Sequence, residues 1–242
     1  MYEQASRLKQ LVKKMHSTKG TNELKIYSVT SGKGGVGKTN ISVNISIALQ
    51  NLGKKVLLVD ADLGLANIDV VTGLNPNYNM SHILYHGKSI KDVMVEGPEG
   101  IMILPGASGL YDLANIKTAE LEYLLNVFKG ISDDFDVVII DTGAGISKNV
   151  LSFVKSSDEA IIITTPEPTA VTDAYALIKI IYKHVEKVHL IVNRAENFKE
   201  AEATMHKILR VSRKFLCFDI SYLGYVLEDK IVYKSNMEQV PF

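Results

Sequence analysis

The sequence predicts an α/β protein with a doubly wound, mostly parallel sheet and helices on both faces. Two apolar segments, residues 55–59 and 137–140, each run directly into an aspartate, and a third, residues 26–29, runs into a glycine-rich loop. Apolar segments of this length between amphipathic helices are typical of buried parallel strands with crossover helices. Because open parallel sheets bind ligands at the carboxyl ends of their strands, we expect the chemistry where these segments end.

Composition excludes several function classes. The chain has 242 residues, 46% of them hydrophobic, which is enough for one large domain. Lysine plus arginine equals aspartate plus glutamate at 27 each, so no overall charge favours nucleic acid or an anionic membrane. A single cysteine, Cys217, excludes an internal disulfide and any cluster of thiolate ligands. No apolar segment approaches the ~18 residues of a membrane span, and the N-terminus lacks a signal-peptide core, so a cytoplasmic protein is expected.

Residues 1–23 are expected to form an amphipathic helix and a polar linker, ahead of a single domain over residues 24–242. The apolar positions at helical spacing are Ala5, Leu8, Leu11, Val12 and Met15, and lysines occupy the other side. The polar residues 18–23 favour a tethered arm. A helix packed permanently on the domain is the alternative.

The glycine-rich loop has the pattern of a phosphate-binding loop. Residues 32–39 satisfy G-x-x-x-x-G-K-[ST] between an apolar strand and a long amphipathic helix. Glycines let the backbone N–H groups turn toward phosphate oxygens. Lys38 is expected to reach the β- and γ-phosphates, and the Thr39 hydroxyl to bind Mg²⁺. The predicted phosphate site comprises Gly32, Lys33, Gly34, Gly35, Val36, Gly37, Lys38, Thr39 and Asn40.

Carboxylates follow two of the predicted strands. Asp60 and Asp62 come after the segment 55–59, and Asp141 closes the segment before it as in a Walker B motif. Asp141 is therefore expected to hold the metal, directly or through water. Residues 142–145, which include two glycines, are expected to act as a hinge. For Asp62, capping of the next short helix is the alternative to a role at the γ-phosphate.

A second lysine, Lys33, follows the first glycine of the loop, and this pattern resembles the deviant Walker A ATPases, the family of MinD and ParA. The resemblance covers approximately residues 24–240. It implies ATP and Mg²⁺ as cofactors and an ATP-dependent homodimer. It also implies that Lys33, Lys38 and Asp62 are the catalytic residues: Lys33 acts on the partner subunit's nucleotide and Asp62 orients the attacking water. Asp60 matches the aspartate near the metal.

The same resemblance assigns the end of the site that binds the base. Asn193 and Arg194 follow the apolar segment 188–192. Asn193 matches the family's adenine-contacting asparagine, and an amide can both donate to and accept from a base edge. The loop that flanks the adenine is matched by Leu227, Glu228 and Asp229.

Three stretches resemble the flagellar branch of this family, the FlhG proteins (also called FleN or YlxH). They are residues 60–69, residues 141–145 and residues 3–9, where Glu3 and Lys9 depart conservatively from the branch pattern Asp-Gln-Ala-x-x-Leu-Arg. The resemblance implies an ATP-hydrolysing switch that regulates the number and placement of flagella. It further implies that Gln4 and Leu8 act on an FlhF-like signal-recognition-type GTPase, with flagellar basal-body or transcription factors as further partners.

The family resemblance also implies reversible association with the inner face of the cell membrane through a basic C-terminal helix, which is expected to be missing from this chain. Direct DNA binding is not expected. The alternatives share the fold: a ParA-like partition ATPase would need a basic DNA-binding face, and a MinD would serve septum placement. A reductase of the nitrogenase iron-protein type would need cysteines for a cluster, and a small-molecule kinase would need an acceptor pocket and a lid.

Overall fold

The computed structural model describes residues 8–12, 24–64, 67–106, 116–131 and 134–242. Within these residues the centre is a sheet with the order β3-β4-β2-β5-β1-β6-β7-β8. Each pair of neighbours is parallel except β3 and β4. The strands are β1 (Lys25–Ser31), β2 (Val56–Ala61), β3 (Val95–Glu96), β4 (Met102–Leu104), β5 (Val137–Ala144), β6 (Glu159–Thr164), β7 (Lys187–Ala195) and β8 (Ser221–Leu227).

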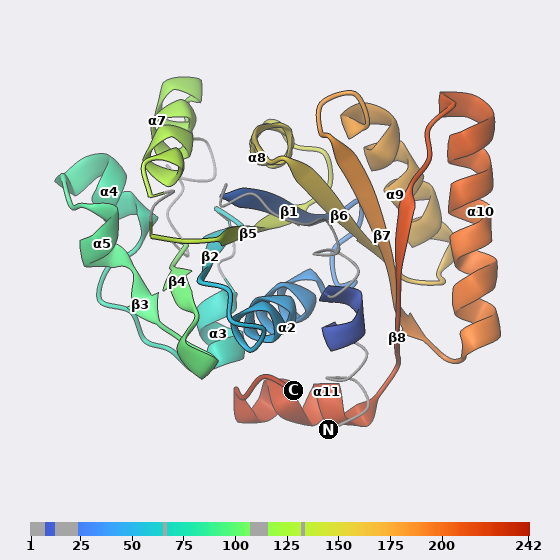
Figure 1. Ribbon diagram of the computed structural model, residues 1–242, viewed down its shortest axis with the longest axis horizontal. Helices are drawn as coiled ribbons and strands as arrows, with labels where there is room; N and C mark the ends of the chain where they lie inside the picture. Colours follow the sequence, from blue (N-terminus) through green and yellow to red (C-terminus); the bar gives the residue numbers. More distant parts are fainter. Residues whose placement is uncertain (1–7, 13–23, 65–66, 107–115, 132–133) are drawn as a thin grey trace.

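Helices cover both faces of the sheet, which confirms the doubly wound fold that the sequence predicts (Figure 1). One face carries α2 (Lys38–Gln50), α3 (Ile68–Thr72) and α11 (Lys230–Glu238). The other carries α7 (Thr118–Lys129), α8 (Lys148–Ser156), α9 (Pro168–Ile181) and α10 (Phe198–Leu216). At the β3 end lie the short helices α4 (Met80–His86) and α5 (Ile90–Val93) and the turn η1 (Pro98–Gly100). Neither α11 nor the antiparallel β3 is among the predicted elements.

The central strands are continuous apolar segments because both of their faces are covered. Every residue of β2 is buried, as is every residue of β5 except the last. On the α2 side, the sheet and helix form one apolar cluster. On the other side, two clusters lie under the helices α7 to α10. Because β2, β5 and β1 are parallel neighbours, their carboxyl ends lie side by side.

The N-terminal turn, residues 8–12, packs into the core instead of standing apart from it. Leu8, Leu11 and Val12 are 1%, 4% and 0% exposed. A Cβ atom on Gly224 of β8 would lie 2.4 Å from Leu11 Cδ2, so turn and sheet touch closely. The predicted boundary at residue 24 therefore does not separate residues 8–12 from the domain, because their apolar side chains find a matching surface on the sheet and on α2. Gln4 and residues 13–23 lie outside the described residues.

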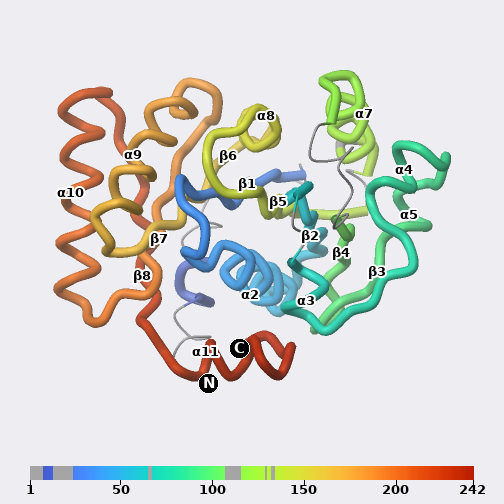
Figure 2. Tube along the Cα trace, turned by 180° about the vertical axis from the view of Figure 1, so that it is seen from behind, coloured from blue at the N-terminus to red at the C-terminus, as the bar shows by residue number. Residues whose placement is uncertain are grey.

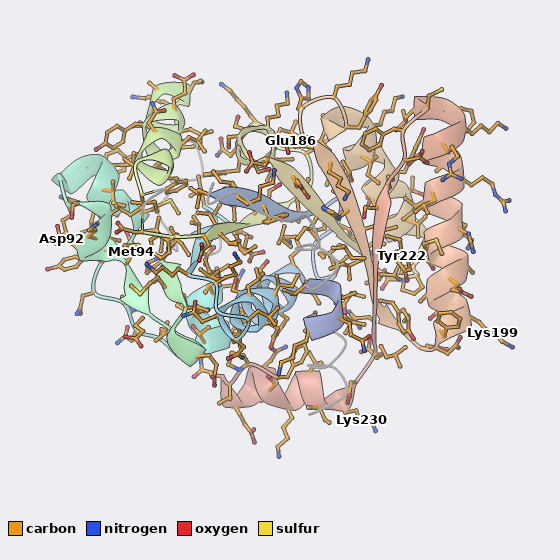
Figure 3. The ribbon with its side chains drawn as sticks, viewed as in Figure 1. Asp92, Met94, Glu186, Lys199, Tyr222 and Lys230 are labelled. Atoms are coloured by element: carbon orange, nitrogen blue, oxygen red, sulfur yellow. The ribbon has the colours of Figure 1, made fainter. Side chains whose placement is uncertain are left out.

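A network of charged groups joins the amino ends of β1, β6 and β7. Lys25 Nζ lies 2.7 Å from Glu186 Oε2 and 3.7 Å from Glu159 Oε1. The other carboxylate oxygen of Glu159 lies 2.5 Å from Nε2 of the buried His189. Figure 3 shows Glu186 far from Lys230, which begins α11. The network thus lies at the opposite end of the strands from the aspartates Asp60 and Asp141.

Candidate nucleotide site

The loop of residues 32–37 joins β1 to α2 at the carboxyl edge of the sheet. Gly35 and Gly37 adopt left-handed conformations with φ of 76° and 90°, which a side chain would strain. Gly37 precedes α2 and provides no side-chain cap for its first N–H groups. These N–H groups and the positive end of the helix dipole together suit an anion. Lys38 and Thr39 open the helix, and the Lys38 side chain is largely buried, at 9% exposed for the residue.

Asp141 lies in β5, beside the first turn of α2, and is 1% exposed. Its Oδ1 accepts a 2.8 Å hydrogen bond from Ser42 Oγ, and the nearby Thr39 hydroxyl favours the charged carboxylate. Burial raises the pKa of Asp141 to about 6, although the neighbouring Lys38 and the two hydroxyl groups act in the opposite direction. A cation would stabilise this buried anion, and carboxylate and hydroxyl oxygens are ligands that Mg²⁺ prefers. Thr39 and Asp141 therefore fit a magnesium ion.

Asp60, the aspartate predicted to lie near the metal, accepts hydrogen bonds from backbone N–H groups. Its Oδ1 accepts from the Asp62 N–H at 3.2 Å, and its Oδ2 accepts from the N–H groups of Asn67 and Ile68, both at 3.0 Å. Burial and the adjacent charge of Asp141 raise the pKa of Asp60 to about 8. With both oxygens bound to backbone, Asp60 ties the loop after β2 and the start of α3 to the sheet. Asp60 thereby anchors the backbone of Asp62, Asn67 and Ile68.

Asp62 lies beside residues 142–145, the predicted hinge. A Cβ atom on Gly143 of β5 would be 3.3 Å from Asp62 Oδ1, and the charge of Asp62 reaches Asp141. The carboxylate thus lies over the glycine that follows the Walker B strand. Gly143 leaves room for it there. This brings the predicted catalytic aspartate, Asp62, beside the predicted metal ligand, Asp141.

Lys33 is held by its own chain. Its Nζ lies 2.6 Å from Glu167 Oε2 and 3.1 Å from Thr169 Oγ1, at the start of α9. The ion pair is at the surface, with side chains 40% and 55% exposed. The preceding Gly32 packs against α9 so closely that a Cβ atom would lie 2.3 Å from the Asp173 carbonyl group. Glu167 is a residue that sequence reasoning missed, because nothing local in the sequence indicates its approach to Lys33.

The predicted base-binding residues line a hollow of about 300 Å³ next to the loop. Its walls include Gly35, Gly37, Asn40, Asn193, Arg194, Leu227, Glu228 and Asp229. Asn193 Nδ2 donates to the Val36 carbonyl at 2.8 Å, so its Oδ1 is the atom left for a ligand. Arg194 Nε donates to Glu228 Oε2 at 2.8 Å, and this ion pair braces the rim.

Helix α11 adds a wall to this hollow that the sequence analysis missed. Val232, Tyr233 and Asn236 line it, and Asp229 caps the helix by accepting from the Ile231 N–H at 2.9 Å. The cap was the available signal, since an aspartate before a run without glycine or proline is typical of a helix start.

Comparison with known proteins shows the family of this chain. Residues 24–194 match the family model described as an AAA domain (AAA_31). The septum site-determining protein MinD of Bacillus subtilis is 35% identical over 223 residues, 88% of this chain and 80% of that protein. The chain belongs to the MinD-like family of ATPases. This confirms the family resemblance stated from the phosphate loop.

Two further relatives of this MinD-like chain carry flagellar names. The antiactivator FleN of Pseudomonas aeruginosa is 38% identical over 218 residues, 89% of this chain and 78% of that protein. The flagellum site-determining protein YlxH of Helicobacter pylori is 38% identical over 250 residues, 97% and 84% of the two chains. Among solved structures, the MinD of Pyrococcus horikoshii complexed with Mg-ADP superposes with a TM-score of 0.77 at 29% identity, covering 90% of this chain and 87% of that one.

Proposed function

We propose that the protein is a Mg²⁺-dependent ATPase that dimerises with ATP and regulates the number and placement of bacterial flagella. The observation that carries the flagellar assignment is the identity to FleN and YlxH over 89% and 97% of the chain, higher than the identity to the Bacillus subtilis MinD. The catalytic part of the proposal rests on the geometry of Lys38, Asp62 and Asp141. Septum placement is the second candidate, supported by the lower identity of 35% to the Bacillus subtilis MinD.

The chain's own groups divide the work of hydrolysis. The loop N–H groups and Lys38 bind and orient the β- and γ-phosphates. Thr39 and Asp141 would hold Mg²⁺, which supplies positive charge to the transferred phosphoryl group. Asp62 lies beside Gly143. Its carboxylate accepts a hydrogen bond from the attacking water and so orients that water. Asp60 keeps the Asp62 loop in place through the backbone.

Dimerisation is proposed to move Lys33 from Glu167 to the partner subunit's nucleotide. The ammonium group is a mobile point charge that can exchange one anion for another. In this structure the Lys33 ammonium group donates to Glu167 and Thr169. Contact with the partner subunit's nucleotide therefore requires that both hydrogen bonds break. An ATP-filled site on the partner would offer a stronger anion than one exposed carboxylate.

Partner proteins and the membrane belong to the same proposal. The N-terminal segment with Gln4 is proposed to act on an FlhF-like GTPase. Leu8 is buried against the domain, so it would contact such a partner only after the N-terminal turn undocks. Reversible membrane association is proposed by family resemblance. In the described part of the chain, no helix is long and apolar enough to cross a bilayer.

The test compares three alanine variants in ATP binding, ATP turnover and flagellar number. Lys38→Ala should lose nucleotide binding, whereas Asp62→Ala should bind ATP, accumulate as a dimer and lose turnover. Glu122→Ala, a change of an exposed carboxylate on α7, is the control and should behave as wild type. Cells lacking the protein should show a wrong flagellar number that wild type restores and Lys38→Ala does not. Normal turnover by Asp62→Ala would refute the catalytic assignment, and normal flagellation without the protein would refute the biological one.

A further inference from the structure

Ser42 lies on α2 one turn after Thr39, on the side of the helix that faces β5. Residues three apart share one face of a helix, and Figure 2 shows α2 running beside β2 and β5. Ser42 is 0% exposed and Asp141 1%, and the 2.8 Å hydrogen bond from Ser42 Oγ to Asp141 Oδ1 joins the helix to the strand. The proposed function gives Ser42 no part, although this side chain bonds to a carboxylate assigned to the metal.

A hydroxyl group on a helix has a nearer partner than a carboxylate on a strand. It can donate to the carbonyl group four residues earlier on its own helix. Ser46, one turn after Ser42 and equally buried, does this, because its Oγ donates to the Ser42 carbonyl at 2.8 Å. The same bond within a helix is made by Thr72, Ser152, Thr172 and Thr204. Ser42 instead donates from the helix layer to the sheet, so its hydroxyl group serves the Asp141 carboxylate and not the helix.

Three side chains of α2 act on the Asp141 carboxylate, namely Lys38, Thr39 and Ser42. In the proposed function Lys38 binds the phosphates and Thr39 binds Mg²⁺. Ser42 has neither task, so its hydrogen bond to Asp141 is expected to persist when nucleotide and cation bind. An aspartate carboxylate rotates within a broad energy minimum about its last side-chain bond, and a fixed donor on one oxygen narrows that range.

We propose that Ser42 is a positioning residue of the magnesium site. Its hydrogen bond holds the Asp141 carboxylate in one orientation toward the cation, so the cation meets a ligand that is already in place. This role rests on the proposed function, in which Thr39 and Asp141 hold Mg²⁺. Loss of a group that orients a metal ligand typically lowers metal affinity by about 10- to 100-fold.

The test measures the binding of Mn²⁺, a paramagnetic substitute for Mg²⁺, by electron paramagnetic resonance on the 242-residue chain loaded with ADP. The chain is kept in excess so that free ADP holds none of the metal. A fluorescent ADP analogue, titrated in the presence of a chelator, reports nucleotide binding without metal. Ser42→Ala should weaken Mn²⁺ binding about tenfold and leave the metal-free affinity for ADP unchanged.

Ser46→Ala is the matched control, because it removes an equally buried hydroxyl group one turn away on the same helix. It should keep both affinities. In the Asp141→Asn background, Ser42→Ala should cause no further loss of Mn²⁺ affinity, since the two side chains act through one contact. Where Ser42→Ala does not fold, Ser42→Cys and Ser46→Cys replace the alanine pair, because a thiol is similar in size to a hydroxyl group but is a weak donor.

Equal Mn²⁺ affinities of the Ser42 and Ser46 variants would overturn the proposal and leave the Mg²⁺ site of the proposed function standing. A parallel loss of metal-free ADP binding in Ser42→Ala would overturn it too, because Ser42 would then support the phosphate loop as a whole. If the unaltered chain loaded with ADP bound no Mn²⁺, the proposed metal site itself would be refuted, and the role of Ser42 with it.

Discussion

Truncating Leu8 tests whether the N-terminal turn is part of the domain. The side chain is 1% exposed and belongs to the apolar cluster around α2. Leu→Ala changes at such positions lower the free energy of unfolding by about 2–5 kcal/mol. A single turn can also detach as a unit, and then the loss cannot exceed the free energy with which the turn docks. We therefore expect a loss of about 2 kcal/mol, at the lower end of that range.

The assay is urea unfolding followed by circular dichroism, on Leu8→Ala, Leu11→Ala and the double variant. If undocking limits the loss, the double variant should lose less than the sum of the two single variants. Leu52→Ala is the matched control, because Leu52 is 44% exposed just after α2. It should change the free energy of unfolding by less than about 0.5 kcal/mol.

A Leu8→Ala variant as stable as Leu52→Ala would refute this reasoning. The turn would then not be docked in solution, and the tethered-arm interpretation of residues 1–23 would hold. Leu8 would be free to anchor a partner directly.

Three further predictions concern the nucleotide site. Glu167→Gln should free Lys33 and strengthen ATP-dependent dimerisation in sedimentation, whereas Asp134→Asn, which breaks the surface ion pair with Lys91, should leave it unchanged. Equal dimerisation of the two variants would exclude the contact between Lys33 and Glu167 as a restraint. Asn193→Ala should weaken binding of a fluorescent ATP analogue about tenfold, because the variant loses the hydrogen bond to the Val36 carbonyl and the contact with the base. Unchanged affinity would rule out the contact with the base. Chelation of Mg²⁺ should stop ATP turnover, and Asp141→Asn should lower the affinity for Mg²⁺. ATP turnover that persists in the presence of a chelator would contradict the metal assignment.

The phosphate loop could be predicted because its information is local. Glycines at fixed spacing, then Lys38 and Thr39, determine both the loop conformation and its chemistry within a few residues. The convergence of Asp62 and Asp141 followed from a general property of parallel sheets, in which strand ends meet at one edge. The backbone contacts of Asp60 could not be predicted, because they depend on how Asn67 and Ile68 return to the end of β2.

The missed elements lack the periodic patterns on which sequence reasoning depends. In α11 only Ser235 is buried, while Tyr233 and Met237 are 71% and 69% exposed, so the helix has no clear apolar face. Strand β3 has two residues, too few to show an alternation. The packing of residues 8–12 is not visible locally either. Their apolar stripe would suit a partner's groove as well as the chain's own core.

Distance and salt separate the charged network at the amino ends of the strands electrically from the phosphate loop. Lys25 is the first residue of β1 and Ser31, at the mouth of the phosphate loop, is the last. Seven residues of strand span about 20 Å, more than twice the Debye length of about 8 Å at physiological salt. Replacing Lys25 or Glu186 should therefore alter heat tolerance while the field at the phosphates stays the same. Anyone engineering a hardier version of this ATPase could begin at that end.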